Sequence, residues 1–386
     1  MNWGQTRNVR NKKVSGMLIA SGCGPTNLRL LALCVTVVAV GCGQSRGTQL
    51  TPMQVVNSPV PATAAATMTV VATTTVTPTP MPSPSPSPLP PALQLTYLSV
   101  VSFNGYAKSI YGVSVGCLEK AMPCFGQPQL LLQSDLQISS YAWSPDGARI
   151  AFAAYAGDQY NIYVANWDGS NRINVSNSPD SADFPAWSPD GQSIGFESCN
   201  HTGCSLVRIN PDGSGREILL QQAAGATKPE SPRLLNWSPD SKAITFVATS
   251  GSGAYDQVFV SDLAGTHISQ LTNESTGEHL SPSYSHTGSQ ISYTSDFEQG
   301  LSTRSDVWVM HSDGNNATNL TRGALRLILD TAWSPQDDWL AFSSEAESDM
   351  VFDIYIVRPD GTSLINVTNT KARNDFSPAW RVVKQP

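Results

Sequence analysis

The amino-acid sequence predicts an all-β protein built as a six-bladed β-propeller, and three observations point to it. A motif of the type Ala-Trp-Ser-Pro-Asp-Gly, seen in full at residues 186–191, recurs through the C-terminal three quarters. Glycine (29) and proline (27) are abundant, as short strands joined by tight turns require. The last repeat is incomplete, and the strands that it lacks stand before the first repeat. By subtraction, the motif's aromatic residue recurs at spacings of 44, 50, 47, 49 and 47 residues: Trp143, Trp187, Trp237, Tyr284, Trp333 and Trp380. Such a period is typical of propellers, whose units must stack to bury their faces.

Residues 1–41 have the features of a signal peptide. Basic residues precede an apolar run at residues 30–40, which has signal-peptide length and is too short to cross a bilayer. The run ends at Val38-Ala39-Val40-Gly41-Cys42, which resembles the lipobox of bacterial lipoproteins, although Ala39 stands where leucine is commonest. The resemblance implies that Cys42 is lipidated and anchors the chain outside the cytoplasm, in the periplasm or at the cell surface. Ordinary signal cleavage beside Cys42 and an uncleaved anchor are the alternatives.

Residues 42–93 are rich in Thr, Pro, Ser and Ala, and eight of the fourteen residues 78–91 are proline. Proline fixes φ and removes a backbone donor, so we expect a disordered stalk with polyproline II character, about 3.1 Å long per residue. Its predicted role is to hold the folded part away from the membrane. A proline-rich ligand for a partner's groove is the alternative.

Four cysteines follow the stalk and fall into two local pairs, Cys117 with Cys124 and Cys199 with Cys204. Each pair spans a short loop, which favours two hairpin disulfides in an oxidising compartment. A four-cysteine zinc site is the competing interpretation, but neither pair has the usual spacing. We therefore predict disulfides, no metal and no cofactor.

Each repeat is expected to contain four strands and two tight turns. In the unit of Trp187, a strand at 184–188 precedes the Pro-Asp-Gly turn, and an alternating strand at 193–197 follows it. A third strand, clearest at 161–164 in the preceding unit, leads to a second turn at Asp168-Gly169. The fourth ends in an apolar residue followed by Ser or Thr, as at Val175-Ser176. Four such strands make one propeller blade.

The repeat count predicts how the ring closes. Five units are complete, but the sixth stops after the strand that contains Trp380. Residues 96–103, 109–115 and 129–132 read as three strands without a first one. We therefore expect the two ends of residues 94–386 to build one blade together.

The repeated Trp-Ser-Pro-Asp-Gly, with the Asp-Ile-Tyr strand and the Asp-Gly turn that follow, resembles the TolB-type propeller repeat, also seen in propellers of prolyl-oligopeptidase-like enzymes. Local departures lie in turns: Ser241 replaces glycine, His286-Thr287 replaces Pro-Asp, and Gln336-Asp337 replaces Asp-Gly. TolB itself carries a folded N-terminal domain, and this chain has the stalk there. The resemblance therefore covers the propeller alone.

The composition excludes some partners. All five charged residues before Cys42 are basic, so the remainder carries 18 basic and 30 acidic residues, a net charge of −12. Such a surface repels nucleic acid.

No nucleophile elbow or His-Glu-x-x-His motif occurs, so we name no catalytic residue. We expect a monomeric, non-enzymatic binding module or envelope scaffold for a protein, peptide or cell-wall saccharide. The alternative is a polysaccharide lyase or hydrolase with a metal at the channel mouth.

The repeat also predicts where binding takes place. Both glycine turns of a unit fall on one face, so the variable loops share the opposite face. The segments just before the first strands bring four candidate residues to the channel mouth: Asp183, His279, Asp330 and Asp375. Converging carboxylates there would suit a cation or a basic peptide end, with solvated rim charges as the alternative.

Overall fold

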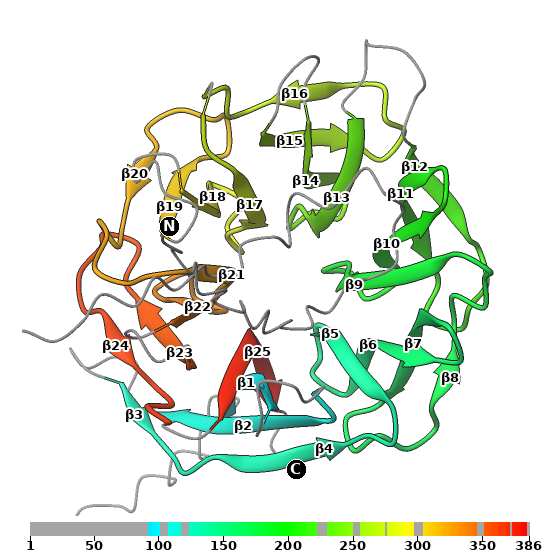
Figure 1. Cartoon of the computed structure of the whole chain (residues 1–386), viewed down its shortest axis with the longest axis horizontal. Coiled ribbons are helices and arrows are strands. Elements are labelled where there is room, and N and C mark those ends of the chain that lie inside the picture. Colours follow the sequence, from blue (N-terminus) through cyan, green and yellow to red (C-terminus); the bar gives the residue numbers. More distant parts are fainter. Residues whose placement is uncertain are drawn as a thin grey trace, which may run out of the picture. The chain divides into compact units, whose positions relative to one another are not determined.

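A computed structural model describes residues 92–100, 107–116, 123–221, 230–249, 255–274, 276–296, 304–345, 351–370 and 373–383. These residues belong to one compact unit and form 25 strands in six antiparallel sheets arranged around a common axis (Figure 1). The predicted fold class is confirmed. Within these ranges no helix is long and apolar enough to cross a membrane. The predicted signal peptide, Cys42 and nearly all of the stalk lie outside the described residues.

Blades 1 to 5 each contain four strands in chain order, and the first strand lies nearest the axis (Figure 1). Blade 1 comprises β5 (Gln137–Trp143), β6 (Arg149–Ala156), β7 (Gln159–Asn166) and β8 (Ile173–Asn174); blade 2 β9 (Ser181–Trp187), β10 (Ile194–Asn200), β11 (Gly203–Ile209) and β12 (Glu217–Gln221); blade 3 β13 (Glu230–Trp237), β14 (Ala243–Thr249), β15 (Asp256–Asp262) and β16 (Ile268–Gln270); blade 4 β17 (His279–Tyr284), β18 (Gln290–Ser295), β19 (Asp306–His311) and β20 (Thr318–Asn319); and blade 5 β21 (Ile328–Trp333), β22 (Leu340–Glu345), β23 (Phe352–Val357) and β24 (Ile365–Asn366).

Blade 6 joins the two ends of the propeller, as the repeat count predicts. Its innermost strand is β25 (Asn374–Val383), followed by β1 (Ala92–Val100) and β2 (Ser109–Gly116). Two short strands, β3 (Cys124–Phe125) and β4 (Gln129–Gln133), both pair with β2. The propeller was expected to begin at residue 94, but strand β1 begins two residues earlier, at Ala92. Leu93 belongs to the strand because it is buried and pairs with both β25 and β2.

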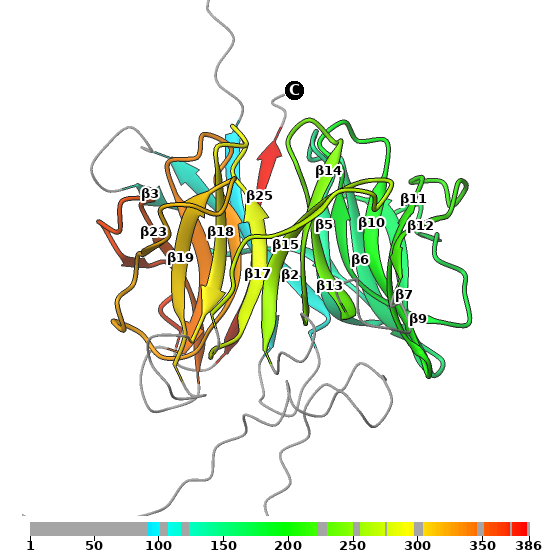
Figure 2. The same ribbon diagram turned by 90° about the horizontal axis from the view of Figure 1, so that it is seen from above.

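The propeller has two unlike faces, seen edge-on in Figure 2. The face that carries the first-to-second-strand and third-to-fourth-strand turns, where β25 ends, is called the turn face. The opposite face carries the second-to-third-strand and inter-blade connections and is called the loop face. Ala92 pairs with Val383, so β1 begins and β25 ends on the turn face.

The recurring tryptophans pack in the seams between blades. Trp143, Trp187, Trp237 and Trp333 are each at most 8% exposed. Trp187, for example, packs with residues of β6 and β7 in blade 1 and with β10 and β11 in its own blade. Burial of one such ring removes ~150–250 Å² from water, which contributes on the order of 4–6 kcal/mol. The motif's aromatic residue is thus part of the inter-blade core.

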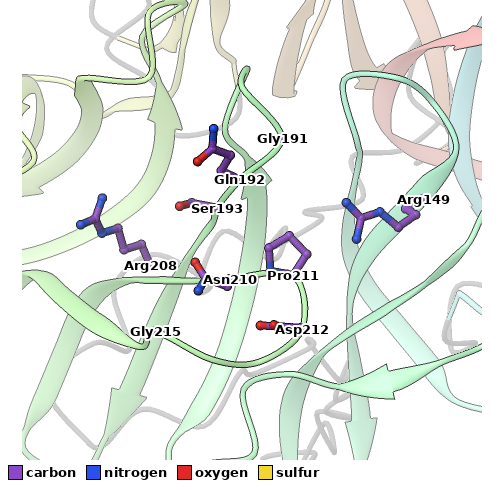
Figure 3. A pocket seen from close by; sticks show the side chains of 9 residues that line it. All are labelled: Arg149, Gly191, Gln192, Ser193, Arg208, Asn210, Pro211, Asp212 and Gly215. Carbon is purple, nitrogen blue, oxygen red and sulfur yellow. The ribbon is translucent and has the colours of Figure 1, made fainter.

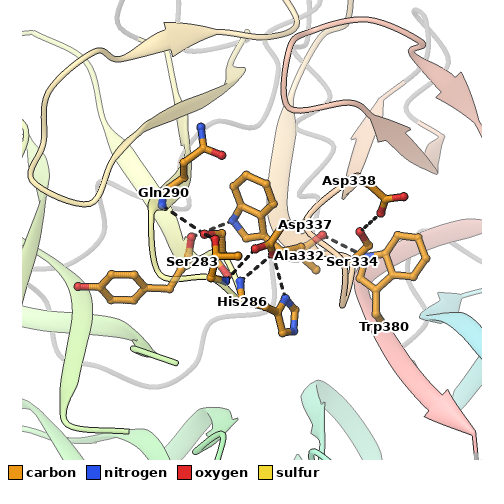
Figure 4. Close-up of polar contacts among 12 residues, drawn as sticks. Ser283, His286, Gln290, Ala332, Ser334, Asp337, Asp338 and Trp380 are labelled. Carbon is orange, nitrogen blue, oxygen red and sulfur yellow. Dashed lines mark hydrogen bonds and ion pairs between the residues drawn. The ribbon is translucent and has the colours of Figure 1, made fainter. Parts of the chain in front are cut away.

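The indole N–H groups also link the blades through hydrogen bonds. Trp237 Nε1 donates to Ala186 O, Trp333 Nε1 to Ser283 O and Trp380 Nε1 to Ala332 O, at 3.0–3.1 Å (Figure 4 shows the last two). Each acceptor is the residue before the aromatic residue of the preceding blade. At the closing seam, Trp143 Nε1 instead donates to Thr96 Oγ1 (2.8 Å), which donates to Ala379 O (2.9 Å).

The Ser-Pro-Asp-Gly turns are closed by their own side chains. Ser188 Oγ donates to Asp190 Oδ1 and accepts from Ser193 N. The glycine position has a positive φ, and Ser241 and Asp337 adopt the same conformation where they replace glycine (φ 58° and 59°). Asp337, which replaces glycine in the blade 5 turn, also links this blade to blade 4, because its carboxylate accepts a hydrogen bond from the backbone N–H of His286 (Figure 4).

The Ser or Thr that ends the fourth-strand segment in four of the blades has a structural role. The hydroxyl oxygens of Ser176, Thr272, Thr321 and Thr368 each accept a backbone N–H from the third strand of the same blade, at 2.9–3.0 Å. These side chains satisfy donors that the short fourth strands leave unpaired. The Asn-x-Ser/Thr patterns at residues 174–176, 319–321 and 366–368 therefore belong to the blade repeat.

Candidate functional site

The four predicted channel-mouth residues lie in the innermost strands, toward the loop face. Asp183 is in β9, His279 begins β17, Asp330 is in β21 and Asp375 is in β25. Among the described residues, no hydrogen bond or ion pair joins any two of the four. Each of the four thus lies in an innermost strand, and their binding of a common ligand stays a prediction.

Asp183 and Asp375 are buried carboxylates with internal partners. Asp183 Oδ1 accepts from Ser139 Oγ (2.8 Å) and Ser140 Oγ (2.5 Å) of blade 1, and Asp375 Oδ1 accepts from Ser99 Oγ of β1 (2.6 Å). Burial raises the pKa of both carboxyl groups, and the serine hydroxyls oppose that rise. Asp183 thus joins two blades, and Asp375 joins the two chain ends.

Asp330 and His279 are held in a similar way. Asp330 is half-buried and its Oδ2 accepts from Ser377 Oγ of blade 6 (3.3 Å); burial raises its pKa. His279 is 1% exposed, its Nε2 lies 2.9 Å from Glu274 Oε2, and its ring packs edge-on against Tyr293. Burial lowers the pKa of His279, whereas the Glu274 carboxylate opposes that change. All four predicted residues therefore have partners within the propeller.

A different group of charges gathers at the loop-face ends of blades 2 to 4, and we call it the acidic cluster: Glu197, Asp256, Glu278 and Asp296 around Arg233. The Arg233 guanidinium pairs with the Asp256 carboxylate. Asp256 N donates to Glu278 Oε2 (2.7 Å), and Glu278 N donates to Asp296 Oδ1 (2.7 Å). Four carboxyl groups and one cation thus form a connected group across three blades.

Burial and mutual repulsion make the acidic cluster unusual. Burial raises the pKa of Glu197 to about 7; the nearby Arg233 lowers it, and Asp183, opposite Glu197 across the β9–β10 pair, raises it further. Burial likewise raises the pKa of Glu278 to about 7. Within the described residues, Glu197 Oε2 and Asp256 Oδ1 are buried oxygens that receive no hydrogen bond. Unsatisfied buried acceptors of this kind favour a cationic or hydrogen-bond-donating ligand.

The sequence did not single out this cluster. Arg233 lies within β13, the first strand of blade 3. Asp256 begins β15, where the equivalent residues of blades 1 and 5 are Tyr160 and Phe352. A charge at a repeat position that two other blades fill with aromatic residues was the signal that could have identified it.

The Cys199–Cys204 disulfide closes the β10–β11 hairpin beside this cluster. Cys117 lies outside the described residues, so the predicted Cys117–Cys124 pair stays a prediction. Ligand atoms of Glu197, Cys199 and Cys204 lie within 4.8 Å of one another. The two sulfurs are bonded to each other, however, and so do not offer the thiolates that a zinc site uses.

The fold and the cluster define a class: a β-propeller whose repeats form a scaffold and whose loop face carries a concentration of buried charge. Residues 126–324, just over half of the chain, match the family described as TolB beta propeller domain, and the chain belongs to this family.

Known relatives agree with this assignment. Tol-Pal system protein TolB from Francisella tularensis subsp. tularensis (strain WY96-3418) is 31% identical over 289 residues, which cover 63% of this chain and 64% of that protein. The chain thus spans less than two thirds of the length of the curated relatives that it matches. Two solved structures share the fold: TolB from Acinetobacter baumannii (TM-score 0.59, 17% identity, 75% of this chain and 66% of that one) and putative TolB from Agrobacterium tumefaciens (TM-score 0.55, 15% identity, 75% and 99%).

Proposed function

We propose that this chain is a lipid-anchored, extracytoplasmic propeller that binds a protein or peptide partner on its loop face and catalyses no reaction. The observation that carries the proposal is the acidic cluster, which lies on the face that the repeat does not specify. The Francisella relative is a Tol-Pal system protein, and membership of the same family supports an envelope setting for this chain.

The connections on the two faces support this choice of face. In blades 1 to 5, the connection between the first and second strands is five or six residues long. The second-to-third-strand connections of the same blades range from two to ten residues. Variable connections on a rigid scaffold are where binding specificity usually resides.

The charges indicate what kind of partner fits. Four carboxyl groups and one guanidinium give the acidic cluster more negative than positive charge, which favours a partner that presents a lysine, an arginine or a free amino terminus. Tyr255, 37% exposed just before β15, offers an aromatic contact at the same end of blade 3.

The anchor is the second part of the proposal. Cys42 carries the lipid, and residues 42–93 give the propeller reach. The Cys42→Ser variant of the full chain should move from the membrane fraction to the soluble fraction of cells. A variant that stays in the membrane fraction would contradict lipidation at Cys42 without bearing on the loop face.

Two variants with matched exposure test the face. Tyr255→Arg changes the loop face, and Leu364→Arg changes a residue of nearly equal exposure (38%) on the turn face. Affinity capture of the full chain from envelope extracts should recover a protein partner with the wild type and with Leu364→Arg, and much less with Tyr255→Arg. Loss of the partner only with Leu364→Arg would overturn the choice of face. Stoichiometric bound transition metal together with cleavage of a polysaccharide would overturn the non-enzymatic assignment.

A further inference from the structure

A hollow of about 740 Å³ opens on the turn face between blades 1 and 2 (Figure 3). Its walls come from three places: the start of β6 at Arg149, the first turn of blade 2 at Gln192 and Ser193, and the end of β11 with the turn after it, including Arg208 and Asn210. It therefore lies on the face opposite to the acidic cluster.

The two arginines of this hollow are departures from the repeat. Arg149 stands six residues after Trp143, where the other units have Ser193, Ala243, Gln290 and Trp339. Arg208 stands five residues before the glycine of its second turn, where the other units have Val164, Val260, Val309 and Ile356. The fold does not need a cation at either position. Both substitutions nevertheless line the same hollow, in a chain with more acidic than basic residues.

The Arg149 guanidinium is available to a ligand. It lies over the Trp187 ring, 4.8 Å from the ring centroid, and no carboxylate among the described residues forms an ion pair with it. The indole holds the charge in place through a cation–π contact. Asp212 is the acidic residue of the wall; its Oδ1 accepts from both the N–H and the hydroxyl of Ser214, and these bonds lower its pKa, so the wall also carries one negative charge.

Arg208 supplies a second cation. Its Nε and Nη2 both bond to one oxygen of Glu217, at 2.7 and 2.6 Å, which leaves Nη1 for another acceptor. Figure 3 shows Arg149 and Arg208 on opposite sides of the hollow, with Ser193, Asn210 and Pro211 between them. The arrangement is two cations separated by a hydroxyl, an amide and a flat apolar ring.

We propose that this hollow binds an acidic oligosaccharide, with a carboxylate of the sugar chain at Arg149, a second at Arg208, and sugar hydroxyls at Ser193, Gln192 and Asn210. Guanidinium groups bind carboxylates through charge-assisted hydrogen bonds, and amide and hydroxyl side chains pair with sugar hydroxyls. The site is independent of the loop face, so the chain can hold a saccharide and a protein partner at the same time.

The probe is trigalacturonic acid, titrated calorimetrically into the full chain at low ionic strength, with neutral maltotriose as the comparison ligand. Wild type should bind the acidic trisaccharide at one site and show no measurable binding of maltotriose. Arg149→Ser and Arg208→Val introduce residues that other units carry at the same positions, so both variants should keep the thermal unfolding midpoint of the wild type. Arg149→Ser should weaken binding tenfold or more.

Lys242→Ser is the matched control, because Lys242 is an exposed cation beside the equivalent turn of blade 3. It should change affinity by less than twofold. The proposal is overturned if wild type does not bind the acidic trisaccharide, if maltotriose binds equally well, or if Arg149→Ser binds as tightly as wild type. Equal weakening by Lys242→Ser would also overturn it, because that result indicates general attraction to cations rather than this site.

Discussion

The hydroxyl of Thr96 should hold the closing seam of the propeller, and Thr96→Val tests it. Thr96 is fully buried, and its Oγ1 contacts three groups: Trp143 Nε1 (2.8 Å), the Tyr141 hydroxyl (2.8 Å) and Ala379 O (2.9 Å). These groups belong to blade 1 and to β25, so one oxygen connects both chain ends with the next blade. Valine keeps the shape of the side chain and removes the hydroxyl.

The expected cost follows from the number of bonds. A buried hydrogen bond contributes about 1 kcal/mol net, and more where its partner is left unsatisfied, so Thr96→Val should lower the free energy of unfolding by about 3 kcal/mol. Thr245→Val is the control, because Thr245 is equally buried but its hydroxyl makes one hydrogen bond, to Phe259 O (2.9 Å). That variant should lose about 1 kcal/mol.

Urea unfolding followed by tryptophan fluorescence measures both values, and the denaturant slopes should stay equal to that of wild type. Equal losses for the two variants would refute the reasoning, since they would show that the Thr96 hydroxyl is no more important than an ordinary buried one. A loss larger at Thr245 than at Thr96 would refute it as well.

Three further variants test the fold and the acidic cluster. Gly147→Ala should destabilise far more than Gly157→Ala in thermal unfolding, because both glycines have a positive φ, but only at Gly147 would the added Cβ meet a β25 carbonyl oxygen, at 1.9 Å. Trp237→Phe should cost about 1 kcal/mol more than Trp187→Phe, since only the Trp237 indole donates to a carbonyl of the preceding blade; equal costs would argue against the indole bonds. The pKa of Glu197 in the folded chain is about 7, above its ordinary 4.5, so the folded state keeps a proton that the unfolded state loses, and stability falls as pH rises from 4.5 to 7. In the Glu197→Gln variant, the free energy of unfolding should decrease by about 3 kcal/mol less over this pH range than in the wild type. An unchanged pH profile in urea unfolding would contradict a carboxyl group that stays protonated in the folded chain.

The repeat made the fold predictable from the sequence, because the aromatic residue and the turns recur in successive units and the terminal hydroxyl recurs in four blades. The closing blade followed from counting: the strand of Trp380 lacked partners, and the strands before Trp143 lacked a first strand. The position of Ala92 in β1 was less visible, because two residues beside a proline-rich stretch carry no periodic pattern of their own.

The candidate site was less predictable for a physical reason. Asp183 and Asp375 lie in innermost strands, and a sequence does not show that serines from neighbouring strands already satisfy them. The acidic cluster depends on contacts between blades 2, 3 and 4, which bring Glu197 and Arg233 together although they lie in different repeats. Departures from the repeat, rather than the repeat itself, mark both this cluster and the hollow at Arg149.

The central claim, that a protein partner binds the loop face, is tested most directly by photo-crosslinking in cells. A benzophenone amino acid would be placed at Tyr255 on the loop face or at Leu364 on the turn face of the full chain, at nearly equal exposure (37% and 38%). We predict one discrete protein adduct from position 255 and none from position 364. An adduct from position 364 alone would contradict the account.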